Sequence, residues 1–241
     1  MSDDNEVLLS VRGEARQTVA PDVAVLAGSI TATRSSKADA IRATASALDN
    51  LTAELVRLGG VPLTVESERS TLTWSAFSAR TQVEREHEPK TGRHEPTGRV
   101  IASVSLNLAV RDFGSLDSLG TVIARQEEYH VQRVAWQVAD DNPAWSSVRA
   151  AAIEAAVRQG RHYAAALGGS LTRVEHIADV GLLGGSAEGR PIKMAGAAGA
   201  RLMSGGGDEG DTPSLDPVPQ EVTAVIEARF VADGVRHPSR L

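Results

Sequence analysis

The chain has 241 residues, of which 41% are hydrophobic and 23% charged, values that are ordinary for a soluble globular protein with a sizeable core. Its formal net charge is −6, so it lacks the overall basic surface that binds a phosphate backbone, and we expect no nucleic-acid partner. The absence of cysteine excludes disulfides and thiolate metal sites. No apolar run approaches the ~20 residues of a membrane helix. The N-terminal sequence MSDDNEV has neither the basic nor the apolar region of a signal peptide, so we expect a cytoplasmic protein with no membrane span.

The stretch from Val7 to Arg34 predicts two strands joined by a short polar turn, with Gly13 near the bend. Pro21 and Asp22 open the second strand, where proline fixes φ and the aspartate can accept hydrogen bonds from the turn. Apolar residues occupy one face of this second strand and the first part of the other face. We therefore expect it to be covered on both sides, by a second layer or by another subunit.

Three helices are predicted from apolar periodicity and capping residues. The first covers 36–58, with Ser36 and Asp39 as a capping box and Gly59–Gly60 as its end. The second begins at Asp112 and ends near residue 128. The third begins at Asn142–Pro143 and runs to residue 169, and it is so rich in alanine that its backbone could lie very close to a neighbour.

Further strands are predicted at 63–80, 100–110, 131–138, 171–180 and 222–232. The resulting order ββαββαβαββ indicates an α+β protein with an antiparallel or mixed sheet of about seven strands and three helices. We expect a single domain over 7–233, with flexible tails at 1–6 and 234–241.

Two polar segments interrupt this pattern. The charged sequence at 83–98 is predicted to be an exposed hairpin loop. The Gly-, Ala- and Pro-rich insert at 181–220 is either a mobile surface excursion or an arm that orders against another subunit.

Candidate chemical residues do not form a recognisable constellation. His87 and His94 lie among glutamates, but zinc needs three or four ligands in fixed geometry, so we expect a solvated segment and no metal. His130, His162 and His176 occur singly, without a serine or aspartate at a catalytic spacing. We therefore expect no catalytic residue and no cofactor.

The three tryptophans at 74, 136 and 145 could line a ligand pocket. Anchors in the core or at an interface are the favoured interpretation, because large aromatic side chains dominate such packing.

Several short motifs occur together in a fixed order. Val11, Gly13, Pro21, Asp22 and Ala24 fit the pattern V-x-G-x-G-x(5)-PD-x-A, with alanine at the second glycine position. Further matches are Gly59 after the first helix, Trp136 in the strand that follows the second helix, and Gly168 at the end of the alanine-rich helix. In these residues the chain resembles the SIMPL-domain family (DUF541), which includes bacterial periplasmic and outer-membrane immunogenic proteins.

The resemblance implies an α+β domain and, for some members, ring-like homo-oligomers. It also carries loose links to stress tolerance and to a signalling-kinase partner, and it implies no enzymatic activity. The chain departs from many members in having no recognisable signal peptide.

We accordingly predict a non-enzymatic protein that self-assembles into a ring or shell-like homo-oligomer, with a stress-related role. The alternative is a binding module that holds a peptide or small ligand between sheet and helices. An enzyme is the least favoured class.

Overall fold

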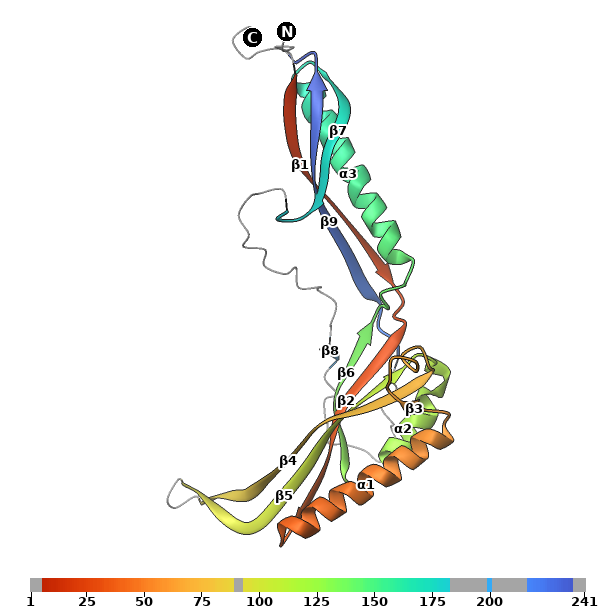
Figure 1. The fold of residues 1–241 in the computed structure, drawn as a ribbon, viewed down its shortest axis with the longest axis vertical. Coiled ribbons are helices and arrows are strands. Elements are labelled where there is room, and N and C mark those ends of the chain that lie inside the picture. The colour runs from red at the N-terminus through yellow and green to blue at the C-terminus, as the bar shows by residue number, and fades with distance from the viewer. Residues whose placement is uncertain (1–5, 89–92, 183–198, 201–215, 236–241) are drawn as a thin grey trace. The chain divides into compact units, whose positions relative to one another are not determined.

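The computed structural model describes residues 6–88, 93–182, 199–200 and 216–235. These residues form two compact units (Figure 1). Unit 1 is built from described residues in 6–19, 138–182 and 219–235, and unit 2 from those in 20–137, 199–200 and 216–218. The sequence predicts one domain over 7–233, whereas within that range each unit has its own sheet and its own core.

Unit 1 is a three-stranded antiparallel sheet with one helix on one face. The strand order is β1-β9-β7, and the elements are β1 (Val7–Val19), α3 (Ala144–Ala166), β7 (Ser170–Asp179) and β9 (Gln220–Asp233). Alternate residues of β1 and β9, among them Leu9, Val11 and Phe230, point to α3 and form the core. This is the alternation expected for a sheet covered on one side.

The helix α3 approaches its own sheet through small residues. Its buried stripe repeats every fourth position and consists of Ala144, Val148, Ala152, Ala156, Gly160 and Ala164. A Cβ atom placed on Gly13 of β1 would lie 2.0 Å from the Ala152 carbonyl oxygen. The close approach predicted for the alanine-rich helix therefore occurs within the chain. This contact requires a glycine at position 13, which lies in the middle of β1. The prediction that Gly13 lies near a bend is therefore wrong.

Unit 2 is a six-stranded sheet with strand order β3-β4-β5-β2-β6-β8. Only the β3–β4 pair is parallel. Its strands are β2 (Val23–Arg34), β3 (Val61–Pro62), β4 (Leu72–Glu88), β5 (Arg93–Val110), β6 (Tyr129–Gln137) and β8 (Gly199–Ala200). Its helices are α1 (Lys37–Arg57) and α2 (Leu116–Ala124). A 3₁₀ turn at Phe113–Ser115 precedes α2.

The core of unit 2 lies between this sheet and the two helices. Large aliphatic side chains of β2, α1 and β5 fill it together with Trp136, whose ring meets that of Phe113 edge-on at a centroid distance of 5.3 Å. Tyr129 also lies in this core, and its buried hydroxyl has no hydrogen-bond partner within the part of the chain that is described. The other large side chains that are fully buried in this core are apolar, and among them only Trp136 carries a polar group, its indole N–H.

The helix boundaries follow the predicted capping residues. The Asp39 N–H donates to Ser36 Oγ at 3.1 Å, and that hydroxyl donates back to the Asp39 carboxylate at 2.7 Å. The Ala144 N–H donates to Asn142 Oδ1 at 2.8 Å at the start of α3. The second helix ends at Ala124, earlier than predicted.

The predicted α+β class is confirmed, and the predicted order ββαββαβαββ is that of the structure once the two-residue strands β3 and β8 are set aside. The strands β1 and β2 are joined by a short connection, as predicted, but they do not pair with each other. Strand β1 pairs with β9 in unit 1, while β2 pairs with β5 and β6 in unit 2.

The charged segment at 83–98 also differs from its prediction as a loop. Strand β4 continues to Glu88, β5 begins at Arg93, and the two strands pair through positions 85–88 and 93–96. Backbone hydrogen bonds hold a hairpin without apolar side chains, so a polar composition does not prevent strand formation. Most of the insert at 181–220 lies outside the described residues.

Replacing Gly13 by alanine should destabilise unit 1, because the added methyl group meets backbone atoms of α3 that cannot rotate away. We expect a loss of about 1–3 kcal/mol or more in the free energy of unfolding, as for other overpacked cores. Chemical denaturation followed by circular dichroism measures it. Gly120→Ala in α2 is the control, since nothing lies within 4 Å of its added methyl, and it should gain up to about 1 kcal/mol in helix propensity. Equal effects of the two changes would contradict the close contact.

Replacing Tyr129 by phenylalanine removes a buried hydroxyl without a described partner. We expect the free energy of unfolding to stay the same or rise by about 1 kcal/mol, because no hydrogen bond is lost and a desolvation cost disappears. Burial raises the pKa of Tyr129 above its usual value of 10.0. Above about pH 10 the Tyr129 hydroxyl loses its proton in the unfolded chain but keeps it in the folded chain. The free energy of unfolding of the wild type therefore falls as pH rises, and that of the variant should fall less. A clear loss of stability at pH 7 would instead show that the hydroxyl is hydrogen-bonded.

Candidate interaction surfaces at the strand edges

Both sheets end in strands whose outer backbone edge has no strand partner among the described residues. In unit 1 these strands are β1 and β7. In unit 2, β3 pairs with β4 only at Thr73 and Trp74, so the rest of β4 up to Glu88 is hydrogen-bonded to a strand on one side alone. Such an edge presents a row of free N–H and C=O groups that can pair with another chain.

These edge strands also carry exposed apolar side chains. On β1, β4 and β7 the exposed large apolar residues are Leu8 (51%), Phe77 (63%), Val83 (51%), Val174 (52%) and Ile177 (42%). Natural edge strands commonly avoid such residues, because they favour association with a second strand. The edges are therefore the leading interaction surfaces of the described chain.

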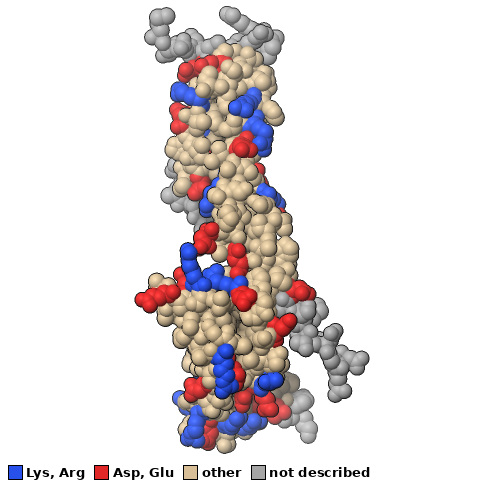
Figure 2. Space-filling view, turned by 90° about the vertical axis from the view of Figure 1, so that its right-hand side faces the viewer, with Lys and Arg blue, Asp and Glu red and all other residues tan. Residues whose placement is uncertain are grey.

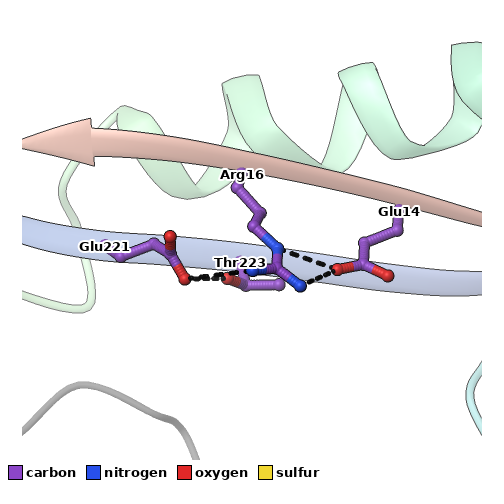
Figure 3. A network of polar contacts seen from close by, with 4 residues as sticks. All are labelled: Glu14, Arg16, Glu221 and Thr223. Atoms are coloured by element: carbon purple, nitrogen blue, oxygen red, sulfur yellow. Dashed lines mark hydrogen bonds and ion pairs between the residues drawn. The ribbon is translucent and has the colours of Figure 1, made fainter.

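The charged side chains of β1 are engaged within unit 1. Arg16 donates two hydrogen bonds to Glu14, of 2.8 and 2.6 Å, and lies 3.8 Å from Glu221 on the neighbouring strand β9 (Figure 3). Arg12 lies 3.5 Å from Glu227 in the same way. The hydrogen bonds that Arg16 donates to the Glu14 carboxylate are the main cause that raises the pKa of Arg16. The charges along β1 thus already have partners in their own sheet.

In unit 2 the hairpin of β4 and β5 extends past the end of β2, as Figure 1 shows. The last β2 pair joins Arg34 to Val100, so the residues of β5 before Val100 pair with β4 alone. At the bend, Gly98 has φ of +80°, Thr97 donates to Glu84 at 2.6 Å, and Arg99 lies 3.8 Å from Glu84. These contacts stabilise a long two-stranded extension, which we call the distal hairpin (residues 83–88 and 93–99).

The distal hairpin brings His87 and His94 directly opposite each other, with ring centroids 5.2 Å apart. Two imidazoles do not complete a zinc site, and no group of three or more His, Cys, Asp or Glu side chains in the described ranges could hold a metal ion. Sequence spacing did not indicate this pair, because a loop was predicted where a strand register places the two residues.

The other titratable candidates lie apart from one another. His130 is on β6, His162 on α3 and His176 on β7. The phenol of Tyr129 lies in the core of unit 2, and burial raises its pKa above the ordinary value of 10.0, further away from physiological pH. The described residues therefore bring no acid, base and nucleophile together.

The residues of the sequence motif occupy structural positions. In unit 1, Val11 belongs to the core and Gly13 lies against α3. Where the chain enters unit 2, Pro21 is buried and the Asp22 N–H donates to the Gln137 carbonyl at 2.8 Å.

The remaining motif residues also occupy structural positions. Ala24 and Trp136 are a cross-strand pair in the core of unit 2. Gly59 and Gly168 end α1 and α3 with φ of +79° and +78°, a conformation that glycine adopts without cost. The motif thus marks how the fold is built, and it does not mark a reactive site.

The tryptophans also act in packing. Trp136 is 2% exposed, Trp74 packs against the same core, and the Trp145 indole N–H donates to the Ala139 carbonyl at 2.9 Å. The space between the sheet of unit 2 and its helices, where a ligand cleft was considered, is occupied by core side chains.

Charges of both signs are interspersed on the face drawn in Figure 2, without a large field of one sign. No helix in the described ranges is long and apolar enough to cross a membrane.

The family model SIMPL, described as a protein of unknown function (DUF541), matches residues 9–230. No curated protein matches the chain. The match is to the family as a whole, and the likeness to its periplasmic and outer-membrane immunogenic members stays a prediction. Since the match spans strands and helices of both units, the chain belongs to the SIMPL (DUF541) family.

Proposed function

We propose that the protein is a non-enzymatic, self-assembling homo-oligomer whose copies associate through their strand edges. The observation that carries this proposal is the long unpaired edge in each unit, on β1 and β7 in unit 1 and on β4 in unit 2, each with an exposed apolar side chain. A stress-related role is part of the proposal through the family resemblance alone.

Edge pairing offers both hydrogen bonds and buried apolar area. Each added strand satisfies backbone groups that otherwise depend on water. Like edges that meet about a two-fold axis form dimers, whereas unlike edges meet head to tail and can close into a ring. A chain with several open edges can therefore build a ring or shell-like scaffold.

The alanine-rich helix α3 and strand β2 are not part of the proposed association. The buried stripe of α3 packs on β1 and β9 of its own unit. The apolar face of β2 likewise lies in the core beneath α1. These two features stabilise the protomer, and the association we propose uses other surfaces.

The second candidate function is peptide binding by strand addition, which would use the same edges. An extended peptide would add to β4 or β7 through main-chain hydrogen bonds. Self-association and peptide capture compete for one surface, so a protein that is fully assembled should bind added extended peptides weakly.

The wild-type chain should have a mass in solution that is a multiple of the 25.3 kDa protomer. Size-exclusion chromatography with light scattering, over a micromolar concentration series, measures this mass. A single 25.3 kDa species throughout the series would contradict self-assembly.

Placing one lysine on each open edge strand should dissociate the assembly. We expect the triple variant Leu8→Lys, Val83→Lys and Val174→Lys to shift towards the protomer mass, because a charge on an edge opposes strand addition. The matched control is Ile41→Lys, Val56→Lys and Val65→Lys, which adds the same charge at exposed apolar residues of α1 and the following turn. Circular dichroism checks that both variants fold. Equal masses for the two variants would argue against the edges.

A further inference from the structure

We infer that the outer edge of β4 in the distal hairpin is a two-fold self-pairing surface, on which β4 of one copy adds antiparallel to β4 of a second copy with Val83 at the centre. This inference rests on the proposed self-assembly and names one of its interfaces. It would join two hairpins into a four-stranded ribbon of order β5-β4-β4-β5.

The two free edges of the distal hairpin differ in their ability to pair. On β5, Pro96 lacks an N–H and the bulge at Gly98 interrupts the ladder, both of which are known protections of an edge strand. From Leu72 to Glu88, β4 contains no proline, and its own bulge, between Ala76 and Ser78, lies outside the distal hairpin. Its outer edge is therefore the one left open to strand addition.

The apolar residue of this edge is suitably placed to meet its own copy. Val83 is 51% exposed although it is paired with Val100 across the hairpin. In an antiparallel pair about a two-fold axis at position 83, the Val83 side chains of the two copies are direct neighbours. Pairs of β-branched residues directly opposite each other are favourable in sheets.

The charges on either side complete the match. Arg80 and Glu86 lie three residues before and three residues after Val83, and both are exposed. Neither forms an ion pair with another described residue, and the Arg80 Nε–H donates only to Ser103 Oγ at 3.3 Å. The proposed axis places Arg80 of each copy opposite Glu86 of the other, so two complementary pairs form at once.

The same symmetry argument does not favour the open edge of β1. On β1 the comparable charges, Arg12, Glu14 and Arg16, already have ion-pair partners in unit 1. A parallel pairing of two β4 strands in register would place Arg80 opposite Arg80 and Glu86 opposite Glu86, which is repulsive. The charge pattern thus favours β4 over β1 and the antiparallel direction over the parallel one.

Charge exchange in the full-length chain tests this arrangement. Arg80→Glu and Glu86→Arg each place like charges opposite each other, so each variant should show a mass at least twofold below that of the wild type in sedimentation velocity at low salt. The double variant Arg80→Glu/Glu86→Arg restores both pairs and should regain the wild-type mass.

An equimolar mixture of the two single variants gives the sharpest readout. One copy then carries acids at both positions and the other carries bases at both, so the antiparallel register predicts that the mixture associates although neither component does alone. The matched control is Arg158→Glu on α3, which breaks an exposed pair with Glu154 at 3.8 Å and should leave the mass unchanged.

The outcomes separate this inference from the proposal on which it rests. A monomeric wild type would overturn both self-assembly and the β4 interface. This holds also if the monomer binds an added extended peptide at the β4 edge. An oligomeric wild type whose single variants keep its mass would overturn the β4 interface and leave self-assembly in place. Single variants that dissociate, with neither the double variant nor the mixture recovering, would overturn the antiparallel register.

Discussion

An open β-sheet cannot satisfy all of its backbone by itself, and this constraint decides most of what distinguishes the protein. Every interior strand donates and accepts on both sides, whereas the two outermost strands leave a row of N–H and C=O groups without a strand partner. The chain forms two separate open sheets and so faces this problem twice. It protects some edges well, with the proline and bulge of β5 as the clearest case, and leaves others long and partly apolar.

The sheet faces are managed differently from the edges. In unit 1 a helix of small residues lies so close to the strands that Gly13 has no room for a side chain. In unit 2 the helices stand off on leucine, isoleucine and tryptophan side chains. The face of unit 1 turned away from α3 carries ion pairs, such as those of Arg16 with Glu14 and Glu221. One face of each sheet is therefore covered by helices within the protomer, and the association we propose uses the edges.

The same reasoning is why we propose self-assembly and not catalysis. Reactive chemistry needs titratable groups held together in one partly dry site. Here the histidines lie on different elements or pair on an exposed hairpin, and the side chain of Tyr129 is buried in the core of unit 2. What the fold holds firmly in place are glycines, alanines and aromatic rings, which shape the protomer that would assemble.

The amino-acid sequence by itself determined the local structure and the family. Periodicity located the main strands and helices, and Ser36, Asp39 and Asn142 marked helix starts that the structure confirms, because capping and alternation act over a few residues. The tertiary structure alone decided which strands share a sheet. It separated β1 from β2, placed Gly13 against α3 and brought His87 opposite His94. Strand partnership and register depend on contacts between residues far apart in the chain, and no local pattern encodes which edge remains open.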